Sequence, residues 1–508
     1  MSLKPRSTAA MVYLVGAGPG DADLITLRGV ECLQQADLVL YDYLVNPRVL
    51  KHAAPQAEIV CLGRHGGGRL WSQTEINRRM IAAAQEGRAV VRLKSGDPMI
   101  FGRAAEEVQA LVAARVPFEI VPGVTTAVAI SAYAGVPLTH RDIASAVAFV
   151  TGQEQDGKAA SAIDYRALAA FPGTLVVYMG VTTAPHWCAA LIAAGKPADT
   201  PVAIVRRCSW PDQQTIRCVL RDVAERLQLE KLRPPIAFVV GPVAAETSGI
   251  DWFTSRPLFG KTVIVTRADE QQNELRRLLE QQGAQVLSSP AIVIGAPADQ
   301  AAVDDAIARL SSYDWLVFSS ANGVRYFLER LILLGGDLRA LGGARIAAIG
   351  SGTSEALMRY RLKSDLQPQD YRAEALAGAL APLVRDKHCL LLRASRGREV
   401  LSERLQEAGA HVDQVIVYQS RDANEPDASV AAALSGGDAD YLTVTSSAIA
   451  RAVVRQFGEA LRRTRLVSIS PITSDALRAV GYPPQLEAQT YNMRGMVEAI
   501  LADAAASS

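Results

Sequence analysis

The chain has 508 residues, of which 49% are hydrophobic and 21% charged, a balance that excludes an intrinsically disordered protein. Its 53 basic and 52 acidic residues give a formal net charge of +1, so a nucleic-acid partner is not expected. No apolar run approaches the roughly 20 residues of a membrane-spanning helix, and the six cysteines form no CxxC pair, so we expect a cytoplasmic, soluble protein without a structural metal or membrane partner.

Short aliphatic runs alternate with amphipathic segments along the chain, whose length suits about three or four domains. The pattern predicts a helix over 24–35 and strands over 11–15, 36–41, 89–93, 174–179, 202–206 and 236–240. This alternation is typical of α/β proteins in which helices cover a largely parallel sheet. We expect residues 1–10 to be disordered and a subdomain boundary to lie near 137–150.

The stretch 249–260 breaks this pattern because it holds two glycines, a proline and no regular period. We interpret 254–260 as a linker between two large modules. The second module contains an internal repeat, in which residues 263–286 resemble 389–412 and two further blocks recur in the same order. This repeat predicts two similar α/β lobes, and a cleft between lobes is a favoured ligand site.

A glycine-rich turn follows the first predicted strand. It consists of Gly-Ala-Gly-Pro-Gly-Asp over 16–21, and its glycines let the backbone approach a ligand closely. The turn does not match the dinucleotide-binding fingerprint, because Asp21 takes the place of the third glycine and Pro19 lacks an N–H donor. This disfavours a nicotinamide-dependent oxidoreductase, while a plain turn remains an alternative interpretation.

Three further motifs of the first module follow predicted strands or end them. They are Arg-Leu-Lys-Ser-Gly-Asp-Pro over 92–98, Pro-Gly-Val-Thr-Thr over 122–126 and Tyr-Met-Gly over 178–180. Open α/β sheets bind ligands at the carboxyl ends of their parallel strands. Turn chemistry explains each motif taken singly, whereas their order and spacing together are specific.

In these motifs residues 11–253 resemble the tetrapyrrole methylase family, specifically the uroporphyrinogen-III C-methyltransferases. The resemblance implies two α/β subdomains (about 11–140 and 141–253), a homodimer and S-adenosyl-L-methionine as methyl donor. It further implies methylation of uroporphyrinogen III at C-2 and C-7 to give precorrin-2. Matching motif by motif, the expected cofactor contacts are Pro19, Ser95, Gly96, Asp97, Ile100, Thr125, Thr126, Met179 and Cys208.

Two residues are assigned to proton handling by the same resemblance. Asp42 matches the family's proton acceptor, and a carboxylate at a strand end suits that role. Arg64 stands where the family has a proton-donating lysine; since arginine stays charged, we expect it to bind a substrate carboxylate. Ser95 and Cys208 stand where the family has glycines, and residues 206–214 resemble a related methyltransferase acting on C-11, so another regiochemistry stays open.

Hydroxyl-rich turns are the conspicuous feature of the second module. They lie at 319–323, 350–353, 445–447 and 470–473, each after a predicted strand and before an apparent helix. Serine and threonine commonly cap helices, which is one interpretation. Four helix N-termini facing one cleft would alternatively bind the anionic groups of a polycarboxylate ligand.

Residues 258–502 resemble the uroporphyrinogen-III synthase family in the segment 313–324, the turns at 350–353 and 470–473, and the Val-Tyr-Gln segment at 417–419. The resemblance implies cyclisation of hydroxymethylbilane without a cofactor, in two discontinuous lobes, 258–292 with 420–508 and 293–419. Tyr418 matches the tyrosine that assists loss of the substrate hydroxyl, although a core tyrosine is the alternative. The expected substrate contacts are Ser319, Ser320, Thr353, Ser446 and Thr473.

The two modules together predict a bifunctional enzyme in which one half makes uroporphyrinogen III and the other methylates it. No additional dinucleotide-binding domain is present in the pattern, so we expect no dehydrogenase or chelatase activity. The alternative hypothesis is that one half has become inactive or serves as a tetrapyrrole-binding module.

Overall fold

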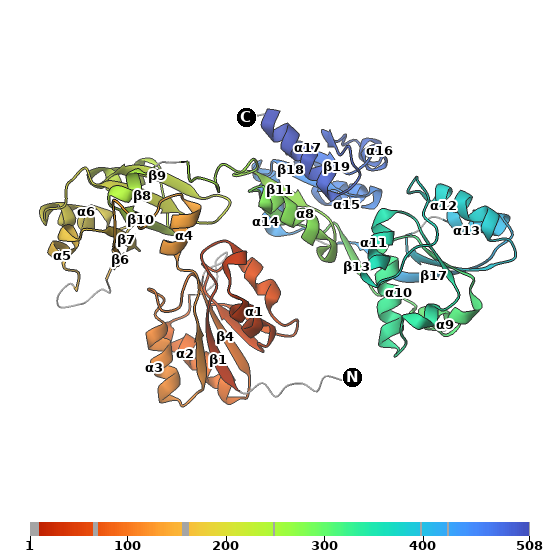
Figure 1. The fold of residues 1–508 in the computed structure, drawn as a ribbon, viewed down its shortest axis with the longest axis horizontal. Coiled ribbons are helices and arrows are strands. Elements are labelled where there is room, and N and C mark those ends of the chain that lie inside the picture. Colours follow the sequence, from red (N-terminus) through yellow and green to blue (C-terminus); the bar gives the residue numbers. More distant parts are fainter. Residues whose placement is uncertain are drawn as a thin grey trace. The chain divides into compact units, whose positions relative to one another are not determined.

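The computed structural model describes residues 10–63, 70–154, 162–246, 249–396, 399–423 and 426–506. Two compact units divide the chain, Met1–Lys261 with Gln281–Gln285, and Thr262–Glu280 with Val286–Ser508. Four five-stranded sheets, each covered by helices, make up the fold (Figure 1). Within the described ranges, no helix is long and apolar enough to cross a membrane. The α/β fold class predicted from the sequence is confirmed.

The first sheet is entirely parallel and has the order β3-β2-β4-β1-β5. Its strands are β1 (Met11–Gly16), β2 (Leu38–Tyr41), β3 (Glu58–Cys61), β4 (Ala89–Lys94) and β5 (Phe118–Val121). The covering helices are α1 (Leu27–Gln34), α2 (Gln73–Gln85) and α3 (Ala104–Ala113). Because β2, β4, β1 and β5 are successive neighbours, the turns that follow them share one edge of the sheet.

Helix α1 starts later than the predicted 24–35. The side chain of Thr26 accepts a hydrogen bond from the Gly29 N–H at 3.1 Å and so caps the helix at Leu27. Residues Ala22–Leu24 instead form a short 3-10 turn. Threonine is a preferred N-cap residue. The aliphatic periodicity that begins at Leu24 concealed this start signal of the helix.

The second sheet is mixed and has the order β6-β7-β10-β8-β9. Its strands are β6 (Val147–Thr151), β7 (Thr174–Tyr178), β8 (Pro201–Arg206), β9 (Gln214–Val219) and β10 (Ile236–Val240). The helices are α4 (Thr126–Tyr133), α5 (Tyr165–Ala170), α6 (Ala184–Ala193) and α7 (Val223–Leu229). Strand β10 runs antiparallel to both β7 and β8, so the largely parallel arrangement expected from the sequence does not extend to this sheet. Helix α4 packs in its core.

The segment interpreted as a linker is packed rather than free. The Trp252 indole N–H donates to the Ala132 carbonyl oxygen at 2.7 Å, and the Tyr133 ring lies 4.8 Å from that of Phe253. Phe253 and Leu258 are both buried. The residues just before the proposed linker are therefore held against α4, and burial of Phe253 and Leu258 favours this packing.

The third sheet has the order β12-β11-β18-β19-β20 and the fourth β13-β17-β16-β14-β15. The third contains β11 (Thr262–Val265), β12 (Gln285–Ser288), β18 (Tyr441–Val444), β19 (Arg465–Ser468) and β20 (Leu486–Glu487). The fourth contains β13 (Ile292–Gly295), β14 (Trp315–Phe318), β15 (Arg345–Ala348), β16 (His388–Ala394) and β17 (His411–Asp422). The helices of the third sheet are α8 (Asp269–Gln281), α14 (Ala428–Gly436), α15 (Ser447–Phe457), α16 (Pro471–Ala479) and α17 (Met493–Ala506). The helices of the fourth sheet are α9 (Gln300–Ala308), α10 (Ala321–Leu333), α11 (Ser351–Arg359), α12 (Ala373–Leu380) and α13 (Val400–Glu407).

The internal repeat predicted from the sequence is present in the topology. Residues 263–286 span β11, α8 and β12, and the matching 389–412 span β16, α13 and the start of β17. The orders β12-β11-β18-β19 and β17-β16-β14-β15 coincide strand for strand. Each lobe thus repeats the other, although the chain order differs. Strands β11 and β12 precede β18 and β19, whereas their counterparts β16 and β17 follow β14 and β15.

Two adjacent strands carry the chain between the lobes. Strand β13 pairs antiparallel with the end of β17, with Ile292 opposite Asp422 and Gly295 opposite Gln419. The Ala423 N–H also donates to the Ala291 carbonyl oxygen at 3.0 Å. One lobe is consequently continuous in sequence, while the other is assembled from two stretches on either side of it.

Candidate functional site

The three turns that follow β1, β4 and β5 at the carboxyl edge of the first sheet approach one another through glycines. A Cβ atom placed on Gly16 would lie 2.6 Å from the Gly123 Cα and 2.7 Å from the Gly96 carbonyl oxygen. Gly18 and Gly96 exchange backbone hydrogen bonds of 3.2 and 2.9 Å. Only glycine permits this contact between backbones. The structure thus brings together three motifs that the sequence separates by up to 107 residues.

Asp97 holds two of these turns in place. Its Oδ1 accepts from the Met99 N–H at 2.8 Å, and its Oδ2 accepts from the Gly123 N–H at 3.0 Å. Both oxygens of this carboxylate are therefore used within the protein. Beside it, a Cβ on Gly96 would lie in ordinary van der Waals contact with the Thr125 and Thr126 backbone, at 3.9 Å, so the Gly96 turn adjoins the first turn of α4.

The second sheet reaches the same place through Tyr178. Its hydroxyl lies 2.7 Å from the Thr125 Oγ1 and accepts a hydrogen bond from the Ala127 N–H at 2.8 Å, at the first turn of α4. The Tyr178 ring lies 5.1 Å from that of Phe101, which follows the Gly96 turn. Met179 comes next, with positive φ and an exposed side chain. The Tyr-Met-Gly motif thus joins the predicted site.

A second connection involves the turn between β8 and β9. The Ser209 hydroxyl donates to the Pro19 carbonyl oxygen at 2.9 Å and accepts from the Asp21 N–H at 3.0 Å. The neighbouring Cys208 is buried in the core of the second sheet, and that burial raises the pKa of its thiol to about 12. Cys208 is therefore a neutral thiol at neutral pH, and its carbonyl packs against Gly20.

Asp42 follows β2 at the same edge, where its N–H donates to the Leu93 carbonyl oxygen at 3.2 Å. Its side chain, 31% exposed, forms an ion pair with Arg92 at 2.6 Å. Arg64, the other residue predicted to act in proton handling, lies outside the described residues. Ser95 and Ile100 lie half-buried on either side of the Gly96–Asp97 turn.

The hydroxyl-rich turns of the second unit begin four helices. Ser320 caps α10 by accepting from the Gly323 N–H at 3.0 Å, and Ser446 caps α15 by accepting from the Ile449 N–H at 3.2 Å. The capping interpretation is therefore confirmed for these two serines. Ser319 instead donates to the Leu392 carbonyl oxygen at 3.0 Å.

Thr353 and Thr473 occupy equivalent places in the two lobes. Each is the third residue of its helix, α11 or α16, and each is buried. Thr473 lies 3.3 Å from the Ser470 hydroxyl. What such turns offer at their surface is mainly backbone N–H groups at a helix N-terminus, which favour anions.

Tyr418 stands on β17 in the lobe formed by the fourth sheet. Its ring stacks on Tyr326, with centroids 5.8 Å apart. Burial raises the pKa of Tyr418, while hydrogen bonds with the side chains of Ser320 and Asn322 oppose that rise. The hydroxyl is therefore protonated at neutral pH and points to the capping turn of α10. A core tyrosine and a proton donor are both consistent with this position.

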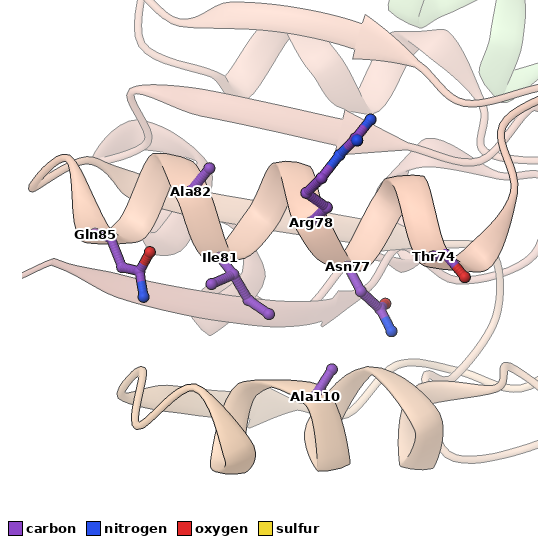
Figure 2. Close-up of a pocket in the computed structure, with 7 residues that line it drawn as sticks. All are labelled: Thr74, Asn77, Arg78, Ile81, Ala82, Gln85 and Ala110. Carbon is purple, nitrogen blue, oxygen red and sulfur yellow. The ribbon is translucent and has the colours of Figure 1, made fainter.

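A surface hollow lies elsewhere on the first unit. It has a volume of about 490 Å³ and lies between α2 and α3, with Asn77, Ile81 and Gln85 of α2 on the side that faces Ala110 of α3 (Figure 2). It is lined by Thr74, Asn77, Arg78, Ile81, Ala82, Gln85 and Ala110. None of the residues predicted from the motifs lines it, so it is no part of the candidate site. Among the described residues no cluster suited to a metal ion is found.

Several residues at the site were not identified from the sequence. Tyr178 and Ser209 each adjoin a predicted residue, but their contacts bridge 53 and 190 residues of chain. Arg92 and Lys94 lie inside a quoted motif, yet their burial was not foreseen. Two charged residues at alternate positions of a strand, on a face covered by a helix, were the available signal.

Comparisons with known proteins match each unit to one family. The family model described as "Tetrapyrrole (Corrin/Porphyrin) Methylases" matches residues 11–224, and "Uroporphyrinogen-III synthase HemD" matches residues 273–498. The chain is 33% identical over 487 residues to the "Porphyrin biosynthesis protein HemD" of Ruminiclostridium josui, which covers 96% of this chain and 94% of that protein.

Two further similarities are to methyltransferases, one that extends beyond the first unit and one that covers about half of the chain. The chain is 33% identical over 358 residues to a "Uroporphyrinogen-III C-methyltransferase" of Bacillus subtilis, covering 70% of this chain and 73% of that protein. The solved structure of a uroporphyrin-III C-methyltransferase from Thermus thermophilus, complexed with S-adenyl homocysteine, is 40% identical. It covers 46% of this chain and 93% of that one, with a TM-score of 0.40.

Proposed function

The chain belongs to the tetrapyrrole methylases in its N-terminal half and to the uroporphyrinogen-III synthases in its C-terminal half, and from this premise we propose that it performs two consecutive reactions. It is a bifunctional enzyme of tetrapyrrole biosynthesis. The C-terminal half cyclises hydroxymethylbilane to uroporphyrinogen III. The N-terminal half then methylates C-2 and C-7 with S-adenosyl-L-methionine to give precorrin-2.

The observation that carries the methyl-transfer proposal is the convergence of the glycine turns with Asp42 on one sheet edge. Backbone amide and carbonyl groups in glycine turns suit a ligand with adenine, ribose and amino-acid parts. The half-buried polar residues Asp97, Thr125 and Thr126 adjoin the Gly96 turn, so the residues present fit S-adenosylmethionine. Pro19, Ser95, Gly96, Asp97, Ile100, Thr125, Thr126, Met179 and Cys208 are the positions proposed to hold it.

The bound cofactor would supply a methyl group on a sulfonium, which an electron-rich pyrrole carbon can attack without prior deprotonation. The protein's part is to orient the two reactants, which accounts for much of the catalysis in such a reaction. Asp42 is proposed to accept the proton that the methylated ring loses. Tyr178 and Ser209 keep the second sheet against the turns, and Arg64 is proposed to bind a substrate carboxylate.

For the synthase half, the caps of α10, α11, α15 and α16 are proposed to bind substrate carboxylates. Ser319, Ser320, Thr353, Ser446 and Thr473 would act chiefly by shaping these turns. Tyr418 is proposed to donate a proton to the leaving hydroxyl of hydroxymethylbilane, which then departs as water. The neutral state of its buried phenol at working pH suits a donor.

Replacing Tyr418 by phenylalanine is expected to slow enzymatic cyclisation by about 10²-fold, since a general acid contributes at least that much. The rate is measured as uroporphyrinogen III formed from hydroxymethylbilane. Tyr313→Phe is the matched control, because Tyr313 is buried in the same lobe and donates to Asp413 at 2.7 Å near the amino ends of the strands. An unchanged rate for Tyr418→Phe would assign this tyrosine to the core alone.

The experiment that tests the function is an anaerobic assay of the full chain with hydroxymethylbilane and S-adenosylmethionine. The tetrapyrrole product is identified by mass and absorbance. Dimethylated precorrin-2 is the expected product. Uroporphyrinogen I, which forms by spontaneous closure, would overturn the synthase assignment, and unmethylated uroporphyrinogen III would show that the methylase half is inactive or redirected. Light scattering of the same sample tests the expected homodimer.

A further inference from the structure

Three buried charged side chains form a network with the candidate proton acceptor Asp42. Arg92 and Lys94 project from β4 toward α3, and Glu107 of α3 meets both of them. The side chains of Arg92, Lys94 and Glu107 are 3%, 4% and 0% exposed, whereas that of Asp42 is 31% exposed. Asp42 is therefore the one member of the network that faces solvent at the strand ends.

The distances define a chain of contacts from Glu107 to Asp42. Oε1 of Glu107 lies 3.0 Å from Nε of Arg92 and 3.0 Å from Nζ of Lys94. Nη2 of Arg92 lies 2.6 Å from Oδ1 of Asp42, and Nζ of Lys94 lies 3.9 Å from Oδ2 of Asp42. Each cation is thus shared between a carboxylate inside the fold and one at the site.

One atom of this network has unused bonding capacity. Oε2 of Glu107 is buried and has no hydrogen-bond partner, while Gln73 of α2 donates to Oε1 at 3.2 Å. Burying three charges and leaving an acceptor unpaired costs free energy, and apolar side chains of similar volume would often be at least as stable. Fold stability alone therefore does not account for the arrangement.

We propose that Glu107 is a positioning residue for the methyl-transfer reaction, which holds Arg92 and Lys94 against Asp42 and sets the charge around that carboxylate. This inference rests on the proposed function, because it takes Asp42 as the proton acceptor. Two cations and two carboxylates balance within the network. A bound substrate with many carboxylates would otherwise attract Arg92 and Lys94 away from Asp42.

The charged groups facing Asp42 are few among the described residues. They are Arg92 and Lys94 of β4 and Glu107 of α3, with the neutral Gln73 amide of α2 behind them. The charge of Lys94 also acts on Glu106, the neighbour of Glu107 in sequence, but Glu106 forms its ion pair with Arg103. Burial, followed by the charge of Arg92, lowers the pKa of Lys94. Substituting a neutral residue for Lys94 or Glu107 therefore changes the net charge of this network by one.

The test compares two substitutions of opposite charge. Lys94→Met removes a cation 3.9 Å from Asp42, and loss of a nearby cation disfavours the charged form of a carboxylate. In the pH profile of kcat for methyl transfer, the rate falls on the acid side, and we call this part of the profile the acid limb. The acid limb should then move to higher pH by about one unit or more. Glu107→Gln leaves two cations facing Asp42 alone, and the acid limb should move to lower pH. The double variant loses one charge of each sign and should return toward the wild-type limb.

A matched control is available on the same sheet. Glu58 of β3 is also shared by two cations, Arg79 at 2.7 Å and Arg88 at 2.8 Å, but it lies at the surface. Glu58→Gln should leave the acid limb where it is. Calorimetric titration with S-adenosylhomocysteine, the probe of correct folding, should give affinities within about threefold of wild type for all folded variants.

The outcomes separate the inference from its premise. If the wild type methylates uroporphyrinogen III but the two single variants move the limb in the same direction, or not at all, Glu107 has a structural role only. If Glu107→Gln does not fold, Lys94→Met and the double variant still decide, since an unmoved limb in Lys94→Met refutes the proposal. Full activity of Asp42→Asn, or a wild type that transfers no methyl group, would instead refute the proposed function.

Discussion

Asp42→Asn is expected to reduce kcat of methyl transfer by about 10²- to 10⁴-fold, the range that a lost general base produces. Asparagine preserves the shape of the side chain and can still accept the hydrogen bond of Arg92, which is 2.6 Å away. It cannot take up a proton. Since Asp42 is distinct from the glycine turns that are proposed to hold the cofactor, affinity for S-adenosylhomocysteine should change by less than about threefold.

The measurement is single-turnover methylation of added uroporphyrinogen III, with cyclisation of hydroxymethylbilane by the same sample as an internal check on folding. Asp37→Asn is the matched control, because Asp37 precedes the same strand at its other end and accepts from the Ala89 N–H at 2.8 Å. That variant should retain kcat. A wild-type rate for Asp42→Asn would remove Asp42 from the mechanism.

Gly123→Ala is expected to weaken binding of S-adenosylhomocysteine by at least about 100-fold. The added methyl group would lie 2.7 Å from the Gly16 Cα and in contact with the Gly96 carbonyl oxygen, and both are backbone atoms. Neither can move without separating the turns that follow β1 and β4. A 100-fold loss corresponds to about 2.7 kcal/mol of binding free energy, which is the consequence of displacing the whole set of backbone groups.

Calorimetric titration of the full chain measures this loss. Gly378→Ala serves as the control, because Gly378 lies within helix α12 and a Cβ there meets no atom within 4 Å. Both variants should cyclise hydroxymethylbilane at the wild-type rate, since Gly123 lies outside the synthase half and a Cβ on Gly378 meets no atom within 4 Å. Wild-type affinity in Gly123→Ala would show that the close approach of Gly16, Gly96 and Gly123 is unrelated to the cofactor.

Glycine positions and strand ends could be predicted from the sequence because their causes are local. Strands β4 and β10 were predicted almost to the residue, since aliphatic runs end there at Gly, Ser or Asp. The turns after them were recognised because only glycine tolerates the backbone shape they need. The duplicated lobes were likewise visible, as the repeat preserves residue types at fixed spacing.

The remaining features depend on contacts between distant segments. An aliphatic run does not encode strand direction, so antiparallel β10 could not be distinguished from a parallel strand. Strands β3 and β9 are partly exposed and contain charged or polar residues, which weakens their periodic signal. The hydroxyl of Tyr178 at the start of α4 follows from the approach of two sheets, and no local pattern predicts that.

The insertion of one lobe within the other also determines when each can form during translation. Strands β13 to β17 and their helices are complete once residue 422 has been synthesised. Strand β11 must wait for β18, because the bond between Thr262 and Asp440 spans 178 residues. At about 5–20 residues per second, the aliphatic edge of β11 stays unpaired for roughly 10–35 s. The inserted lobe is thus the first of the two to fold on the ribosome, and nascent chains arrested before residue 440 should present β11 to chaperones and proteases.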